Sequence, residues 1–155
     1  NCEFTVTPAG FLELSNGNIL FSGSFDELGQ MAYRGFLRCY DPSLFELWSE
    51  EILYDDHTFL SGVDYTEDGD VLCSGWTATD GFSPFETVDV CPLLIFLYPD
   101  SGELVSYSVE EEADQTAEFV FSGGIGEYFI IGENVPENED QSDVFFGRIV
   151  VRDQL

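Results

Sequence analysis

The chain has 155 residues, of which 44% are hydrophobic and 15% aromatic, and its formal net charge is -27. This length supports one domain with a buried core, and so apolar a composition excludes a disordered acidic tail. The charge excludes nucleic acid as a partner and disfavours an anionic membrane, because both would repel the chain. Cations, cationic surfaces, neutral glycans and further copies of the protein remain as partners.

The N-terminal segment, residues 1–8, predicts a half-buried strand. Cys2, Phe4 and Val6 alternate with polar residues, and Pro8 is expected to end the strand. We expect this strand to lie outside the repeats that follow and to serve as a self-assembly strand.

Three similar segments follow the N-terminal strand, at 14–23, 65–75 and 123–132. Each contains a glycine in a tight turn, then an apolar strand, then a closing glycine. A polar loop and a second apolar strand come next, and in the first two copies a turn leads into a last strand. The chain therefore divides into repeat 1 (9–56), repeat 2 (57–113) and repeat 3 (114–155), each an antiparallel meander.

The second apolar strand of each repeat has one apolar face. We align Gly35, Leu37 and Cys39 of repeat 1 with Leu93, Ile95 and Leu97 of repeat 2 and with Gly147, Ile149 and Val151 of repeat 3. The four arginines fall on the opposite face, where we expect them to pair with local carboxylates.

The turn and strand at 68–75 and the strand at 36–41 carry a family resemblance. Asp68-Gly69-Asp70-Val71-Leu72-Cys73-Ser74-Gly75 and Phe36-Leu37-Arg38-Cys39-Tyr40-Asp41 resemble the blade motifs of bacterial secreted β-propellers. The resemblance covers about residues 11–155, implies a β-propeller-like fold and an extracellular setting, and transfers no catalytic residue. The departure is the repeat number, because propellers close with four to eight blades.

Repeat 3 ends after its second apolar strand and lacks the last strand of the meander. We expect the N-terminal strand to fill this vacancy, either within its own chain or from a neighbouring chain. The fold class expected is therefore all-β, with three antiparallel meanders of four strands, the last completed by an N-terminal strand.

The cysteines and the start of the chain bear on location. An even number of cysteines, four, suits an oxidising compartment. We favour a disulfide between Cys73 and Cys91, with Cys2 and Cys39 paired within or between chains. Because the chain starts with Asn1 instead of Met, we expect a mature exported protein, with an excised fragment of a larger chain as the alternative.

Other candidate sites are sparse. The single histidine, His57, lies in an acidic segment and is expected to be a solvated residue, not part of a catalytic triad. Asp68 and Asp70 are weak Ca²⁺ candidates without EF-hand spacing, and we expect no other cofactor. Trp76, Phe82 and Phe85 flank the long loop of repeat 2 and are candidates for stacking on a carbohydrate.

These observations favour a non-enzymatic, extracellular structural module that self-associates by β-strand complementation, as in a fibre or surface assembly. A carbohydrate-binding adhesion domain and a fragment of a larger propeller enzyme are the alternatives.

Overall fold

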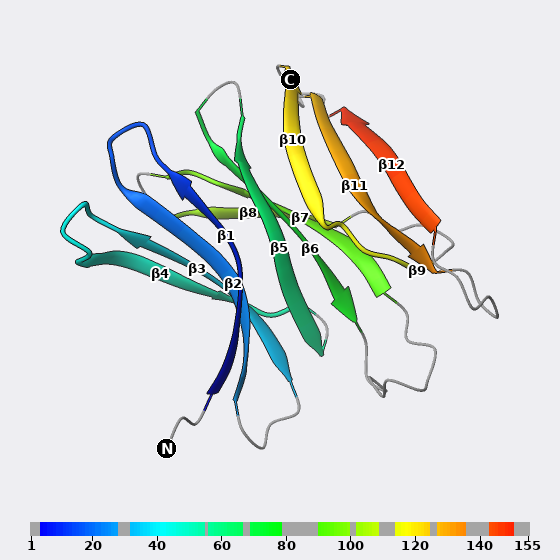
Figure 1. Ribbon diagram of the computed structural model, residues 1–155, viewed down its shortest axis with the longest axis horizontal. Helices are drawn as coiled ribbons and strands as arrows, with labels where there is room; N and C mark the ends of the chain where they lie inside the picture. The colour runs from blue at the N-terminus through cyan, green and yellow to red at the C-terminus, as the bar shows by residue number, and fades with distance from the viewer. Residues whose placement is uncertain are drawn as a thin grey trace.

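The computed structural model describes the chain at residues 4–27, 32–54, 56–66, 69–78, 90–99, 102–108, 114–124, 127–135 and 143–150. In these ranges every regular element is a β-strand, and the strands form three antiparallel sheets (Figure 1). This arrangement confirms the prediction of an all-β chain with antiparallel sheets.

The strands of each sheet follow one another in chain order. The first sheet contains β1 (Phe4–Glu13), β2 (Ile19–Glu27), β3 (Tyr33–Tyr40) and β4 (Glu46–Ile52). The second sheet contains β5 (His57–Tyr65), β6 (Val71–Ala78), β7 (Val90–Leu97) and β8 (Leu104–Ser108). In the third sheet β10 (Phe119–Gly124), β11 (Glu127–Val135) and β12 (Asp143–Val150) are neighbours, and the short β9 (Asp114–Gln115) pairs with the end of β11.

The same turn joins the first two strands of the first sheet and of the second sheet. The Leu14 amide donates to the Asn18 carbonyl at 2.7 Å, and the Thr66 amide donates to the Asp70 carbonyl at 2.8 Å. Gly17 and Gly69 have φ of 83° and 88°, a left-handed conformation that glycine adopts without steric cost. Leu14 therefore corresponds to Thr66, and the strands after the two turns can be compared residue by residue.

Steric crowding explains why each repeat closes with a glycine. A Cβ atom on Gly23 would lie 2.6 Å from the carbonyl oxygen of Thr7 on the adjacent strand. A Cβ atom on Gly75 would collide with the Phe59 carbonyl oxygen, and one on Gly132 would collide with the Thr116 carbonyl oxygen. The neighbouring strand shifts register beside the first two of these glycines, between Pro8 and Gly10 and between Leu60 and Gly62. The repeated glycine thus admits a bulged partner strand.

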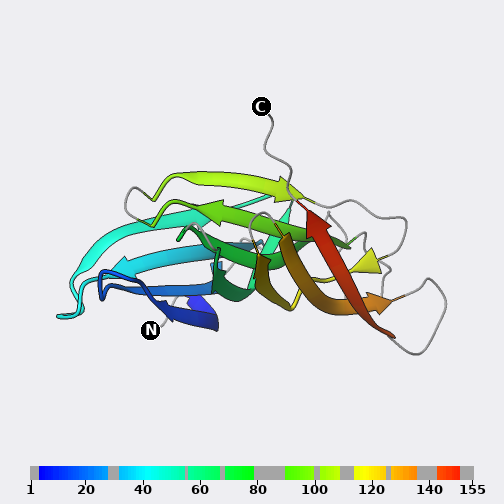
Figure 2. The same cartoon turned by 90° about the horizontal axis from the view of Figure 1, so that it is seen from above.

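The three sheets stack face to face, with the second sheet in the middle (Figures 1 and 2). Its strand β5 contacts β1, β2 and β3 of the first sheet as well as β10 of the third. The first interface is an apolar core to which both sheets contribute, including Leu20, Leu37 and Leu60. Leu72 and Leu94 of the second sheet form a separate core with Tyr128, Ile130 and other residues of the third sheet.

The prediction that the N-terminal strand completes the third sheet within its own chain is wrong. β1 runs from Phe4 through Pro8 to Glu13 and pairs with β2 along its length, so it is the first strand of the first sheet. Pro8 does not end the strand, because the register shift after it accommodates a residue without an amide hydrogen. The segment from Phe4 onward therefore does not complete the third sheet of its own chain, and Cys2 lies outside the described residues.

The alignment of the second apolar strands is wrong by one residue between repeats 1 and 2. It is wrong by two residues between repeats 2 and 3, because Leu93 and Phe145 lie opposite the closing glycines. Leu20 corresponds to Leu72 from the shared turn, and these residues lie opposite Cys39 and Phe96 respectively. Cys39 therefore corresponds to Phe96 and not to Leu97. Since successive residues of a strand point to opposite faces, the one-residue error matched opposite faces of the two strands, although Gly35, Leu37 and Cys39 do form the buried face of β3.

Candidate functional site

The side of the first sheet turned away from the second sheet is rich in aromatic rings. We call this surface the first-sheet face, and its residues include Val6, Pro8, Phe11, Phe21, Phe25, Phe36, Arg38 and Tyr40. Ring centroids are separated by 6.4 Å for Phe11 and Phe21 and by 5.6 Å for Phe21 and Tyr40. Phe11 is 73% exposed, so this face carries a large apolar surface into solvent.

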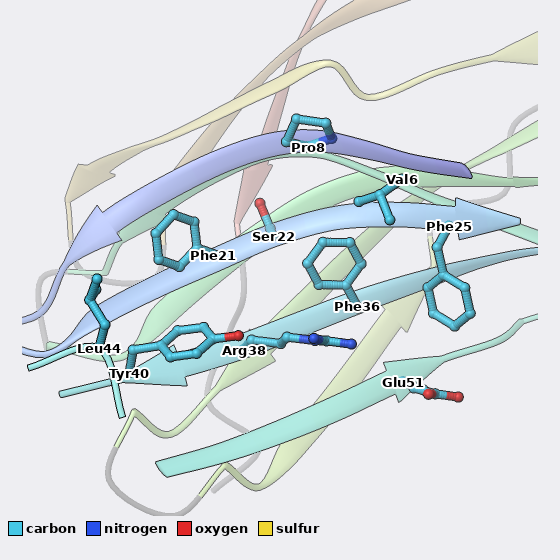
Figure 3. Close-up of a pocket in the computed structure, with 10 residues that line it drawn as sticks. All are labelled: Val6, Pro8, Phe21, Ser22, Phe25, Phe36, Arg38, Tyr40, Leu44 and Glu51. Carbon is cyan, nitrogen blue, oxygen red and sulfur yellow. The ribbon is translucent and has the colours of Figure 1, made fainter. Parts of the chain in front are cut away.

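A hollow of about 630 Å³ lies on the first-sheet face. Its walls come from all four strands of the sheet and from Leu44 in the turn between β3 and β4 (Figure 3). Figure 3 shows the rings of Phe21, Phe36 and Tyr40 lying across β2 and β3, with the side chain of Arg38 between them. The hollow therefore has an apolar floor with a few polar groups, the composition of many binding sites.

The charged groups at the hollow are in contact with its floor and rim. The guanidinium carbon of Arg38 lies 5.4 Å from the centre of the Phe36 ring, which is cation–π geometry. Arg34 Nη1 lies 3.5 Å from Glu51 Oε2, and both side chains are partly exposed. The expected pairing of arginine with a local carboxylate is thus observed for Arg34, at a strength typical of surface pairs.

A second apolar surface lies at the opposite end of the stack. The third-sheet face is the side of the third sheet turned away from the second sheet, and it contains Phe119, Phe121, Phe129, Val144, Phe146, Arg148 and Val150. Val144 is 79% exposed, Phe146 64% and Phe119 60%. The Phe146 ring stacks on Phe129 with centroids 5.5 Å apart.

Arg148 is the charged residue at the centre of the third-sheet face. Its Nε donates to Oε1 of Glu127, so this arginine also pairs with a local carboxylate, as expected. β12 pairs with β11 along one edge, and within the described ranges no strand pairs with its other edge. An exposed apolar strand with an unoccupied edge can accept a further strand.

The interpretation of His57 as a solvated residue is wrong. His57 begins β5 and is 5% exposed, and its Nδ1 accepts a hydrogen bond from the Tyr33 amide at 3.2 Å. Its ring also packs against Tyr33. The imidazole therefore joins the start of the second sheet to β3, which is a structural role.

The predicted disulfide between Cys73 and Cys91 is not formed. Cys73 lies opposite Ile95 on the adjacent strand, whereas Cys91 lies opposite Thr77. Four residues of strand span about 13 Å, well beyond the roughly 7 Å that a disulfide allows between Cα atoms. Cys73 is a buried thiol, and burial raises its pKa to about 12.

The predicted disulfide between Cys39 and Cys2 is also not formed. Cys39 is a thiol in the first core with no exposed surface, so it is inaccessible to Cys2 of another copy. Burial raises the pKa of the Cys39 thiol as well. Both cysteines act as small apolar residues of the core.

The remaining candidates are only partly described. The indole of Trp76 stacks on Phe59 with centroids 3.9 Å apart, so one face of this ring is covered, while Phe82 and Phe85 lie outside the described residues. Asp70 follows the turn at Gly69, and Asp68 lies outside the described residues. Within the described ranges, no three His, Cys, Asp or Glu side chains are grouped so that they could hold a metal ion.

No protein-family model matches the chain, and a search of curated proteins finds no match. In the described part of the chain there is no helix with the length and apolar character needed to cross a membrane.

The two apolar faces are candidate functional surfaces that sequence reasoning missed. Their signal is present in alternating residues such as Val144, Phe146 and Arg148, but the same alternation would describe a strand whose apolar side is covered. Only the stacking order shows that, among the described strands, no sheet lies against the outer sides of the first and third sheets.

Proposed function

We propose that the protein is a non-enzymatic structural module that self-associates through the first-sheet face and the third-sheet face. The carrying observation is that both ends of a three-sheet stack present aromatic side chains to solvent. Phe11, Phe119 and Phe146 are each more than half exposed. Large contiguous apolar surfaces on a protein mark interaction sites.

Burial of the two apolar faces is expected to favour association. Burial of apolar area contributes about 25 cal/mol per Å², and stable interfaces bury about 1,200–2,000 Å² in total. The aromatic rings and the hollow on the first-sheet face provide the buried anchors and the pocket that such interfaces use. Strand addition from a neighbouring copy at the outer edge of β12 would extend this contact.

We also propose that the assembled sheets are arranged as in a propeller. Three stacked meanders are fewer than the four to eight blades of a closed propeller, and further sheets against the two faces would complete such a ring. We propose an extracellular setting on the basis of the acidic composition and the resemblance to secreted propellers. The cysteines give this setting less support, since Cys39 and Cys73 are buried thiols.

There are two alternatives to self-association. In the first, the chain is a fragment of a larger propeller enzyme, and further repeats of that protein cover the two faces. In the second, the protein binds carbohydrate, which has less support at Trp76 because Phe59 covers one side of its indole.

The oligomeric state tests the proposal. We expect native mass spectrometry of this chain to show an assembly, and expect Phe146→Ser to shift it toward monomer. Tyr98→Ser is the matched control, because Tyr98 is 48% exposed but belongs to neither face. A folded chain that is monomeric at all concentrations would overturn self-association and favour the larger propeller.

A further inference from the structure

We infer that copies meet head to tail: the third-sheet face of one molecule docks on the first-sheet face of a second molecule, and two molecules close a ring of six sheets. This inference rests on the proposed self-association and adds which surfaces meet. It follows from the way the sheets of one chain already contact each other.

Each sheet uses opposite faces for the preceding and the following sheet. Leu20 of the first sheet packs toward the second sheet, and its equivalent Leu72 packs toward the third. The next residue along, Cys73, packs back toward the first sheet. Its equivalent in the first sheet is Phe21, which lines the hollow and meets no other sheet of the described residues.

The two open surfaces are therefore complementary in role. The first-sheet face is the side that meets a preceding sheet, and the third-sheet face is the side that meets a following sheet. A contact between one of each repeats the two interfaces present within the chain. A contact between two equal faces would have no counterpart in the chain.

The register of the sheets identifies which residues should meet. A Cβ atom on Gly35 would lie 2.9 Å from the side chain of Leu60 and 3.2 Å from that of Thr58, so these positions touch across the first interface. In the third sheet the position of Gly35 is occupied by Val144, because each lies opposite the residue that follows the closing glycine, Ser24 or Glu133.

The positions of Leu60 and Thr58 are occupied in the first sheet by Pro8 and Val6. Leu60 and Pro8 lie opposite the closing glycines Gly75 and Gly23. Val144 of one copy is thus expected to contact Val6 and Pro8 of the other. These residues are exposed in the single chain, with Val144 at 79% and Val6 at 56%.

A second pair of contacting residues follows from β1, β5 and β10, which occupy the same place in the three sheets. A Cβ atom on Gly10 would lie 3.0 Å from Val63 Cγ1. Gly10 and Phe119 occupy equivalent positions, and so do Val63 and Phe11. Since glycine is replaced by phenylalanine here, Phe119 of one copy and Phe11 of the other would meet as two rings and not as closely packed backbones.

Closure with two copies follows from the number of sheets. Each chain supplies three sheets, so two chains supply six, within the range at which stacked sheets close into a ring. A closed pair covers both apolar faces of both molecules. An open chain of copies would leave one face exposed at each end.

Cysteine cross-linking tests the pairing. Val6→Cys and Val144→Cys are made separately in the full chain with Cys2→Ser and Cys91→Ser, while the buried Cys39 and Cys73 are retained. One variant carries a mass tag, and the two are oxidised alone and as a mixture. Tyr98→Cys mixed with either variant is the control for random collision.

The head-to-tail contact predicts a cross-linked dimer of the two variants in the mixture. Its yield should be at least tenfold above that of either variant alone and above that of the control. Cross-linking of either variant with itself would overturn the inference in favour of equal faces. An assembly in native mass spectrometry without any cross-link would overturn the inference while self-association stands. Monomers throughout would overturn both.

The double variant Val6→Cys/Val144→Cys tests closure. A closed ring predicts a single covalent dimer on denaturing gels. A ladder of higher species would overturn closure with two copies and would indicate an open filament.

Discussion

The hydroxyl oxygen of Ser24 accepts a hydrogen bond from the backbone amide of Leu60 at 2.9 Å, between the first sheet and the second. Ser24 is 2% exposed, and the Leu60 amide lies beside the register shift of β5, where the regular ladder of strand hydrogen bonds is interrupted. The side chain thus satisfies an amide that the bulge would otherwise leave buried and unpaired.

Ser24→Ala is expected to lower the free energy of unfolding by about 1–3 kcal/mol, because a buried donor loses its acceptor. Urea unfolding followed by tryptophan fluorescence measures the change. Ser49→Ala, at an exposed position of β4, is the control and should change stability by less than about 0.5 kcal/mol. Equal stability of the two variants would contradict a role for the Ser24 hydroxyl.

Gly75→Ala is expected to destabilise the fold by more than about 3 kcal/mol, because the new methyl group collides with the Phe59 carbonyl oxygen and the backbone of β5 cannot yield cheaply. Thermal unfolding by circular dichroism measures this loss. Gly147→Ala is the comparison, since its Cβ would first meet a ring atom of Phe145 at 3.3 Å, which a small ring movement relieves. A smaller loss at Gly75 than at Gly147 would show that the bulge is not rigid.

The buried thiol of Cys73 predicts a loss of stability at alkaline pH. Burial raises its pKa in the folded protein to about 12, above the 9.0 of an exposed thiol. The folded state therefore holds the proton more tightly, so the stabilisation is complete below pH 9 and is lost as the pH rises from 9 toward 12. In that window the free energy of unfolding should fall by up to about 1.4 kcal/mol per pH unit from this group.

The contribution of Cys73 is isolated by comparison with Cys73→Ala. Other groups titrate equally in both proteins, so the difference between their pH slopes belongs to this thiol. Parallel slopes for the two proteins would contradict the prediction. The thiol should also resist alkylation at pH 8 until the protein is unfolded.

Leu44 has a φ of 64°, a left-handed conformation that is costly for a leucine. Leu44→Asn should raise the free energy of unfolding by about 0.5–1 kcal/mol, because asparagine enters this conformation more easily. Chemical denaturation measures the gain, and Leu47→Asn on the exposed side of β4 is the control, for which no gain is expected. Destabilisation by Leu44→Asn would indicate that packing of Leu44 outweighs its backbone strain.

Self-association should strengthen with salt. Each chain has a formal charge of -27, so two copies repel one another at long range. At 0.1 M salt the screening length is about 10 Å, and the apolar contact between faces then acts against a weaker repulsion. Sedimentation at 20 mM and 500 mM NaCl should show tighter assembly at the higher salt. Weaker assembly at high salt would point to a contact made by ion pairs.

The local features of the repeat could be predicted from the sequence. Glycine at 17 and 69 specified the same turn, and alternating or continuous apolar residues specified the strands, because both depend on neighbouring residues in the chain. The closing glycines were visible as a pattern, but their cause was not. The collision is with the backbone of Phe59 or Thr116, on a segment that only the fold places beside the glycine.

Predictions that depended on pairing were less successful. Pro8 was expected to end a strand, but the register shift beside it lets β1 continue, and the strand thought to be spare is paired with β2. His57 and Cys73 were placed in the wrong surroundings, because their burial depends on which sheet packs above them and not on their neighbours in the chain.

The sequence by itself determined an acidic, all-β chain of three related units, since strand propensity, glycine turns and net charge are properties of the residues themselves. Only the tertiary structure decided which side of each strand is covered. Phe21 and Leu20 are adjacent and both apolar, but stacking of the second sheet buries Leu20 and leaves Phe21 on an open face. Burial is a property of the packed sheets, so the surfaces proposed for self-association became visible only when the sheets were in place.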